Sequence, residues 1–322
     1  MQLCFFPGCN TPAIRPDVER AIRASMPVLG IELVDADNYV CCPAFGSFPS
    51  ADEEAWMATS AWNLSIAEKN GCDFVVQCGS CYSSLRMGRE HLVHDAEKLA
   101  HANELLEPTG RQVTGQSKVR HVSEVLFREI GPEKIASQLK NNLQGLHGVV
   151  QYPCHTLFPS EVVGFEESAR APQGLRRLVE ALGAKVDGYS RELECCGGAG
   201  GFMKSTPEQA IEFAQRKFDA ILAETQADFI AVSCITCLMH MERVQNTLNE
   251  QLGEERYHIP VFDYNQLLAL CLGFDPKQVA SICNVPRDSV ISRMVSVNPT
   301  RNRPPTNEIV VEDGKSEVKQ AP

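Results

Sequence analysis

Cysteine is the residue type whose number and spacing in this sequence point to chemistry. The chain has 14 cysteines in 322 residues, and ten of them form two copies of one pattern: a single cysteine, two adjacent cysteines, and a C-x-x-C motif. The first copy contains Cys9, Cys41, Cys42, Cys78 and Cys81. The second copy contains Cys154, Cys195, Cys196, Cys234 and Cys237. The intervals also agree, with 31 and 35 intervening residues in the first copy and 40 and 37 in the second. An isolated C-x-x-C is a weak signal, but a doubled five-cysteine pattern strongly indicates metal binding.

The ligand type narrows the kind of metal site. Thiolates are soft ligands, and sites built from thiolates alone favour iron–sulfur clusters, zinc or copper(I). Zinc needs only four ligands in a tetrahedron, so five cysteines in each copy exceed its requirement. Two adjacent cysteines can bind neighbouring irons, which favours an iron–sulfur assembly larger or less regular than a four-ligand cubane. The second cysteine pair is followed by Gly197-Gly198-Ala199-Gly200-Gly201, where backbone N–H groups can approach cluster sulfurs and tune their reduction potential.

The C-x-x-C motifs by themselves allow another chemistry. In thiol–disulfide exchange one thiolate with a low pKa attacks the substrate and a second cysteine resolves the mixed disulfide, without a metal. Both C-x-x-C motifs here follow a predicted strand, as they would in a thioredoxin-like fold. The single and paired cysteines have no role in that chemistry, so the complete pattern favours a cluster.

The remaining cysteines and two histidines need separate interpretation. Four cysteines lie in apolar or unremarkable surroundings and are predicted to be small buried hydrophobic residues: Cys4, Cys72, Cys271 and Cys283. His155, next to Cys154, is a candidate to position substrate or donate a proton, although a supporting hydrogen bond is the more common role. His240, one turn past Cys237, is predicted to lie on a helix surface.

The predicted elements place the cysteines at one kind of position. Strands are predicted at residues 3–7, 31–36 and 74–76 and again at 149–153, 185–189 and 229–232, with helices at 16–29, 54–70, 172–182 and from 207 onwards. Thr206, Pro207 and Gln209 predict a capping box at the start of the last helix. Strands that alternate with helices predict parallel sheets, in which ligands bind at the carboxyl ends of the strands. Every patterned cysteine lies at or just beyond such an end.

The predicted fold is therefore α/β, with two pseudo-repeated domains of parallel-rich sheets flanked by helices and with cysteines on loops at the strand C-termini. We expect an N-terminal domain with a helical connector at residues 1–148 and a C-terminal domain at 149–298. Residues 299–322 have no periodicity and are predicted to be disordered.

Composition limits the function further. A net charge of −11 speaks against nucleic acid as a partner. The first residues have no basic leader, and no apolar run approaches the roughly 18 to 20 residues that span a bilayer, so we expect a soluble cytoplasmic protein without a membrane span. Thiols stay reduced in that compartment, which favours metal or redox chemistry over structural disulfides.

Local sequence around the cysteines resembles a known family. The similar segments are Phe6-Pro7-Gly8-Cys9, Cys41-Cys42-Pro43-Ala44, residues 62–68 (WNLSIAE) and residues 261–268 (VFDYNQLL). Together with the doubled pattern, they resemble the cysteine-rich CCG domains of the B-type subunit of heterodisulfide reductase over about residues 1–285. The doubled motif is highly specific for this superfamily.

The resemblance implies a detailed function. Each five-cysteine set would bind one noncubane [4Fe-4S] cluster, and the protein would be the catalytic subunit that reduces the coenzyme M–coenzyme B mixed disulfide of methanogens to two thiols. Electrons would come from partner subunits of the heterodisulfide reductase, namely a C-type iron–sulfur subunit and an A-type subunit with flavin and iron–sulfur clusters, with hydrogenase or formate dehydrogenase subunits in a larger complex. One alternative is a related component of a succinate, lactate or glycolate oxidoreductase complex. Another is an assembly protein that binds zinc in place of a cluster and has no catalysis of its own.

Overall fold

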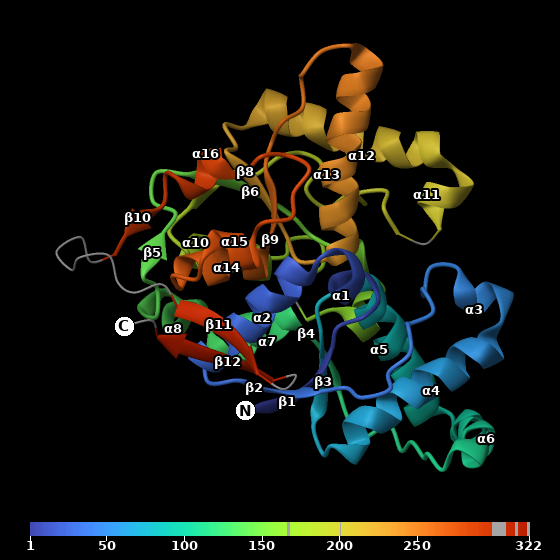
Figure 1. The fold of residues 1–322 in the computed structure, drawn as a ribbon. Helices are drawn as coiled ribbons and strands as arrows, with labels where there is room; N and C mark the ends of the chain where they lie inside the picture. Colours follow the sequence, from blue (N-terminus) through green and yellow to red (C-terminus); the bar gives the residue numbers. More distant parts are fainter. Residues whose placement is uncertain (166–167, 200, 298–306, 313–314, 321–322) are drawn as a thin grey trace.

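The computed structural model describes residues 1–165, 168–199, 201–297, 307–312 and 315–320 (Figure 1). It contains two four-stranded sheets in which all neighbouring strands are parallel. The first has the order β2-β1-β3-β4, with β1 at Gln2–Phe6, β2 at Glu32–Asp35, β3 at Asp73–Val76 and β4 at Val119–His121. The second has the order β7-β6-β8-β9, with β6 at His147–Gln151, β7 at Lys185–Val186, β8 at Phe229–Val232 and β9 at Val261–Asp263. The predicted α/β class with parallel sheets flanked by helices is confirmed.

The helices follow the strands in the same order in both repeats. The first repeat contains α1 (Asn10–Ile14), α2 (Pro16–Val28), α3 (Phe48–Ala51), α4 (Glu53–Lys69), α5 (Gly79–His94), α6 (Ala96–Leu106) and the 3-10 turn η1 (Glu107–Thr109). The connector contains α7 (Val122–Val125), the π-helical segment η2 (Leu126–Ile130), α8 (Pro132–Ser137) and β5 (Asn141–Asn142). The second repeat contains η3 (Cys154–Thr156), α9 (Ser160–Val163), α10 (Gly174–Ala181), α11 (Phe202–Ser205), α12 (Pro207–Glu224), α13 (Ile235–Leu252), α14 (Tyr264–Cys271), α15 (Pro276–Val279), α16 (Asp288–Ile291) and β10 (Val295–Ser296).

The central strands are apolar because the sheets are covered on both faces. All four residues of β8 and the last four of β1 are buried, as expected for parallel strands between helix layers. Registers such as Phe5 beside Val75 and Val149 beside Ile230 align the carboxyl ends of neighbouring strands. The loops that carry the cysteines therefore leave each sheet at the same edge.

Helix ends agree with the sequence in part. α4 begins where the Asp52 side chain accepts a hydrogen bond from the Ala55 N–H, and Gly71 just past its end has a φ of +65°, consistent with a glycine cap. The capping box predicted at α12 is not formed. Thr206 is the N-cap and Pro207 the first residue, but the Thr206 hydroxyl donates to the Phe202 carbonyl because α11 directly precedes it and offers that acceptor.

Four buried charged residues join the two repeats. Arg15 donates to Asp17 in the first repeat at 3.1 Å and to Glu242 of α13 in the second at 3.0 Å. Arg287 donates to the other oxygen of Glu242 at 2.9 Å and lies 3.8 Å from Asp17. Each of these side chains is at most 3% exposed. The two positive and two negative charges balance, so the contact between repeats contains no uncompensated charge among these four residues.

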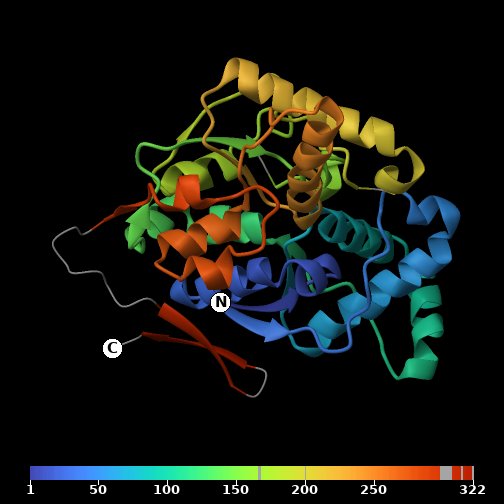
Figure 2. The same cartoon turned by 45° about the horizontal axis from the view of Figure 1, so that its top comes forward.

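Helix packing strengthens the same contact. Figures 1 and 2 both show α14 and α15 of the second repeat beside α2 of the first, and contacts between these helices link segments far apart in sequence. β10 also returns to pair antiparallel with β5 of the connector. The strand β6 begins at His147, so the predicted domain boundary between residues 148 and 149 falls inside it.

The C-terminal segment differs from the prediction of disorder. Residues 307–312 and 315–320 form two antiparallel strands, β11 (Asn307–Glu312) and β12 (Lys315–Gln320). The sequence carries a signal for the first of these strands, since Ile309-Val310-Val311 is a β-branched run. The other residues of the predicted tail, 299–306, 313–314 and 321–322, lie outside the described residues.

Candidate metal centre

The first five cysteines come together at the carboxyl edge of the first sheet. Cys9 is the N-cap of α1, the Cys41–Cys42 pair lies in the loop between β2 and α3, and Cys78 and Cys81 lie at the start of α5. The sulfur atoms of Cys42 and Cys81 are 2.9 Å apart, and the Cys9 and Cys41 thiols are within hydrogen-bonding reach. The arrangement requires glycine at position 8, where φ is +72° and a Cβ would lie 3.1 Å from the Cys81 sulfur.

The second five cysteines repeat this arrangement. The sulfur atoms of Cys154 and Cys195 are 3.8 Å apart, and those of Cys196 and Cys237 are 3.2 Å apart. Cys234 is the N-cap of α13. The loop after the cysteine pair packs closely: Gly197 has a φ of +89° and its N–H donates to the Cys195 sulfur at 3.3 Å. A Cβ on Gly198 would lie 2.8 Å from the Cβ of His240, so the backbone of this loop packs tightly against α13.

The two sets meet at the start of their C-x-x-C helices. The Cys78 and Cys234 sulfurs are 3.9 Å apart, and the Gly79 N–H, which begins α5, donates to the Cys234 sulfur at 3.3 Å. Thr236 of the second repeat also lies 3.6 Å from the Cys78 sulfur through its hydroxyl. Each repeat therefore places groups against a cysteine of the other.

All ten thiols form one row of neighbouring contacts. In order, the row contains Cys9, Cys41, Cys42, Cys81, Cys78, Cys234, Cys237, Cys196, Cys195 and Cys154. Equivalent cysteines of the two repeats occupy mirrored places on either side of the centre of the row. The row is thus pseudo-symmetric about the contact between Cys78 and Cys234.

Burial and mutual contact shift the pKa values of these thiols in opposite directions. Hydrogen bonds with Cys41 and Cys81 lower the pKa of Cys42 to about 6, and a hydrogen bond with Cys154, followed by one with Cys196, lowers that of Cys195 to about 2. The pKa of each of these neighbours is raised instead, and that of Cys81 rises through its bonds to Cys42 and Cys78 and through burial. Thiolates this close repel one another, so a cationic group is needed to hold a whole set ionised.

The donor set fits an iron–sulfur cluster by its chemistry. All 14 cysteines are free thiols, and each set offers five soft ligands beside backbone N–H groups. Within the described part of the chain, no three Cys, His, Asp or Glu side chains are arranged around one point to hold a single metal ion; the sulfurs lie in a row instead. Cys9 and Cys41 are exposed and Cys154 and Cys195 are half-buried, so both ends of the row reach the surface.

The other candidate residues take different positions. His155 is half-buried, and its Nδ1 lies 2.8 Å from the Ser83 hydroxyl of α5 in the first repeat, so its side chain links the repeats. The prediction that His240 lies on a helix surface is wrong. Its side chain is 4% exposed, because the Gly197–Gly198 loop covers it, and its Nε2 lies 3.1 Å from the Ala210 carbonyl.

The four cysteines outside the pattern lie away from the row. Cys4 and Cys271 are fully buried, as predicted, whereas Cys72 and Cys283 are half-buried. Burial, followed by the neighbouring Cys72, raises the pKa of Cys4 to about 12.

Two side chains beside the row were not singled out from the sequence. Ser83, the partner of His155, follows Cys81 by two residues on α5. Lys217 of α12 is fully buried, and its amine donates to the carbonyls of Arg191 and Glu194, just before the second cysteine pair. A signal for Lys217 exists in the sequence, since it stands among Ala210, Ala214 and Ile221 at the spacing of a buried helix face.

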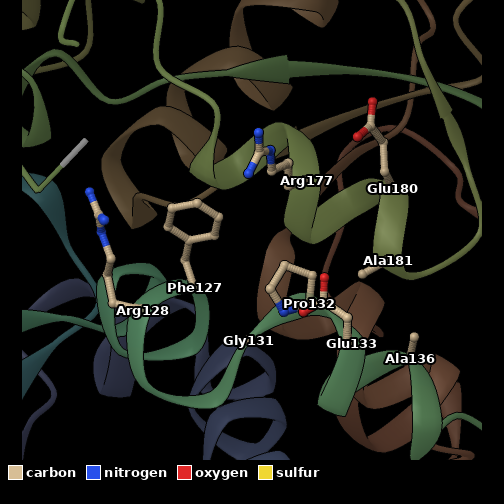
Figure 3. Close-up of a pocket in the computed structure, with 9 residues that line it drawn as sticks. All are labelled: Phe127, Arg128, Gly131, Pro132, Glu133, Ala136, Arg177, Glu180 and Ala181. Atoms are coloured by element: carbon tan, nitrogen blue, oxygen red, sulfur yellow. The ribbon is translucent and has the colours of Figure 1, made fainter. Parts of the chain in front are cut away.

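One surface pocket is separate from the cysteines. It has a volume of about 660 Å³ and lies between η2, α8 and α10. Figure 3 shows Arg177 and Glu180 of α10 on one side and Pro132 and Glu133 of α8 on the other. Its lining includes basic and acidic side chains and no cysteine, so it adds nothing to the candidate centre.

Comparison with known proteins matches both halves of the chain to one family model. The family model described as "Cysteine-rich domain" (CCG) matches the chain twice, at residues 3–86 and 149–242, which together span more than half of the chain and cover both five-cysteine sets. The chain belongs to the CCG cysteine-rich domain family. Both matches of this CCG protein begin in the first strand of a repeat and end on the helix that carries the C-x-x-C motif, α5 or α13.

Curated relatives extend over most of the CCG protein. It is 40% identical over 291 residues, 90% of this chain and 97% of the relative, to a protein of Archaeoglobus profundus that is named as similar to the B-type subunit of heterodisulfide reductase. It is 35% identical, over 86% of this chain and 91% of the relative, to the B-type subunit of a ferredoxin/F(420)H(2)-dependent CoB-CoM heterodisulfide reductase of Methanosarcina acetivorans. It is also 28% identical, over 88% of this chain and 96% of the relative, to an "8-methylmenaquinol:fumarate reductase membrane anchor subunit" of Wolinella succinogenes.

One solved structure shares the fold. A hypothetical protein from Helicobacter pylori superposes with a TM-score of 0.67 at 13% identity, and the alignment covers 86% of this chain and 50% of that protein. At this identity the likeness concerns the fold alone. Within the described residues, no helix is long and apolar enough to cross a membrane.

Proposed function

We propose that this protein is the catalytic subunit of a heterodisulfide reductase, which reduces the mixed disulfide of coenzyme M and coenzyme B to two thiols. The observation that carries the proposal is the pseudo-symmetric row of ten cysteines, in which two equivalent five-thiol sets meet at Cys78 and Cys234. Cleaving a disulfide takes two electrons. Two equivalent centres in contact are suited to act together on the two sulfurs of one substrate.

Each set would hold one noncubane [4Fe-4S] cluster as thiolate ligands. The first set is Cys9, Cys41, Cys42, Cys78 and Cys81, and the second is Cys154, Cys195, Cys196, Cys234 and Cys237. When bound, each cluster would supply a one-electron centre that binds one substrate sulfur. The N–H groups of Gly79 and Gly197, which already donate to cysteine sulfurs, would stabilise negative charge on them.

The surrounding side chains would orient the reacting groups. His155 lies beside Cys154 and is held by Ser83 of the opposite repeat, so its ring is fixed relative to both sets. This position suits it to orient the product thiols or to transfer a proton to one of them. The exposed Cys9 and Cys41 and the half-buried Cys154 and Cys195 mark the sides from which substrate can approach.

Electron supply would depend on other proteins. The sequence has no flavin or nucleotide motif, and relatives named as B-type subunits of heterodisulfide reductases support membership of a multisubunit reductase complex. The partners would be a C-type iron–sulfur subunit and an A-type flavin-bearing subunit, together with hydrogenase or formate dehydrogenase subunits. A fully active monomer that used a pyridine nucleotide directly would contradict this assignment.

The deciding experiment measures iron and acid-labile sulfide in protein purified without oxygen. We expect clusters in both repeats, and a paramagnetic species when the coenzyme M–coenzyme B disulfide is added to the oxidised or half-reduced complex. Chelation of the iron should abolish activity. If iron-free protein remained active and a covalent adduct formed on Cys78 or Cys234, thiol exchange would replace cluster chemistry as the mechanism.

A second function is supported by the likeness to the Wolinella succinogenes fumarate reductase protein. In that case the two centres would relay electrons between partner subunits without acting on a disulfide. The two functions differ in one measurement, because only the reductase would give a spectral change on addition of the disulfide alone.

A further inference from the structure

Both repeats hold the chain just before the cysteine pair with one side chain from the following long helix. In the first repeat this residue is Asn63 of α4, which is fully buried. Its Oδ1 accepts from the Val40 N–H at 3.0 Å and its Nδ2 donates to the Val40 carbonyl at 3.1 Å. Val40 immediately precedes Cys41, so Asn63 fixes the position of the backbone next to the first cysteine pair.

In the second repeat Lys217 of α12 takes this place. Its amine donates to the carbonyl of Glu194 at 2.8 Å and to that of Arg191. Glu194 immediately precedes Cys195, as Val40 precedes Cys41. A neutral amide in one repeat thus corresponds to a cationic amine in the other.

Lys217 is a buried charge without a carboxylate partner in the described part of the chain. The nearby Glu194 carboxylate pairs with Arg191 at 2.7 Å, and Glu192 pairs with Arg176 at 2.9 Å. The amine instead lies 5.5 Å from the centre of the Tyr189 ring. A fully buried lysine without a counter-ion is rare, and a nearby negative group would stabilise its charged form.

Once its cysteines bind a metal centre as thiolates, the second set would supply such a negative charge. Burial lowers the pKa of Lys217 to about 8, and charges on Cys196, Cys237, Glu194 and Cys195 act in the opposite direction. The amine therefore stays largely protonated at neutral pH. Its field is little screened because it lies inside the protein.

A positive charge stabilises the reduced form of a redox centre more than the oxidised form, because reduction adds negative charge. We propose that Lys217 is a positioning residue that raises the reduction potential of the centre in the second repeat above that of the first. The inference rests on the proposed function, since it requires a cluster in each repeat. The two centres are then unequal, and the first electron to arrive resides in the second repeat.

The test is a redox titration of the full-length protein, purified without oxygen with its associated subunits and monitored by electron paramagnetic resonance. Signals are assigned to the repeats with Cys195→Ser, which removes a ligand of the second centre only. In Lys217→Gln, which keeps two N–H donors but no charge, and in Lys217→Met, the reduced-to-oxidised ratio of the second centre at the wild-type midpoint should fall at least tenfold. This fall corresponds to about 59 mV for one electron.

Three control variants distinguish the effect of the Lys217 charge from effects of a changed local structure. Lys217→Arg keeps the charge and should retain the wild-type midpoint. Lys204→Met removes an exposed lysine close to the same loop and should leave both midpoints unchanged. Asn63→Ala removes the neutral side chain that holds Val40 in the first repeat, and it should not move the midpoint potential of the second centre.

Several results would overturn the inference. One is an unchanged second midpoint in both Lys217→Gln and Lys217→Met with iron content retained, and another is an equal shift of both centres. A shift in Lys217→Met alone would assign the effect to the hydrogen bonds instead of the charge. Wild-type protein without iron or sulfide would overturn the proposed function and this inference with it, whereas the other results leave the proposed function standing.

Discussion

Loss of the Glu242 charge is expected to lower the free energy of unfolding by weakening the contact between the repeats. The Glu242 carboxylate receives hydrogen bonds from Arg15 at 3.0 Å and Arg287 at 2.9 Å, and its side chain is 3% exposed. Glu242→Gln keeps the size of the side chain but leaves the two arginines with Asp17 as their only buried carboxylate in the described residues. Leaving one buried charge uncompensated costs about 3–5 kcal/mol.

The measurement is urea unfolding of the iron-free protein in reducing buffer, followed by circular dichroism. The matched control is Glu212→Gln, which breaks an exposed pair with Arg216 on α12 and should cost below about 0.5 kcal/mol. A double variant, Glu242→Met with Arg287→Met, removes one charge of each sign and should cost less than Glu242→Gln, because Arg15 and Asp17 still balance. A loss below about 1 kcal/mol in Glu242→Gln, or a double variant less stable than the single one, would refute the argument that charge balance secures this contact.

Three further predictions test the site and its surroundings. Cys195→Ser should remove or convert the iron centre of the second repeat and spare the first, while Cys271→Ser should leave the iron content unchanged, because a hard oxygen ligand holds iron–sulfur centres less well than thiolate. Gly198→Ala should lower the free energy of unfolding by about 1–3 kcal/mol, because its Cβ would lie 2.8 Å from a buried histidine; Gly188→Ala, whose Cβ would meet nothing closer than 3.7 Å, should have little effect in the same urea assay. Burial lowers the pKa of His121 from 6.5 to about 4, so the unfolded chain binds this proton first as the pH falls. The free energy of unfolding should then decrease by up to about 3 kcal/mol between about pH 6.5 and 4, and a pH profile of His121→Gln with the same decrease as the wild type would contradict this assignment.

The sequence predicts those features of the fold that depend only on residues close together in the chain. β8 was predicted at residues 229–232 and observed at Phe229–Val232, because a buried parallel strand is a short apolar run that a helix follows. The same alternation placed each cysteine at a strand end. Periodicity could not show that the two sets meet, because that contact depends on pairs such as Arg15 and Glu242, which are 227 residues apart.

Other differences arose where tertiary packing decided the outcome. His240 has the spacing of a surface residue on α13, but the glycine loop of the second repeat covers it. The Thr206 hydroxyl bonds backwards to Phe202 because a short helix precedes it. Lys217 is one polar residue among several in an amphipathic helix, and only the structure shows that its amine donates to the carbonyl of Glu194, next to the second cysteine pair.

The meeting of α5 and α13 has an electrostatic consequence. Cys78 and Cys234 are the N-caps of helices of 16 and 18 residues, and the first N–H of α5 points at the Cys234 sulfur. A helix N-terminus carries about half a positive elementary charge, so two like ends of helix dipoles face each other where the repeats join. Without negative charge between them, the two helix ends repel each other. With a negative group between them, both ends attract that group. Negative charge between the two helix ends therefore stabilises the contact between the repeats. A change in that charge must change the stability of the contact, and separation of the repeats must change how strongly the charge is held.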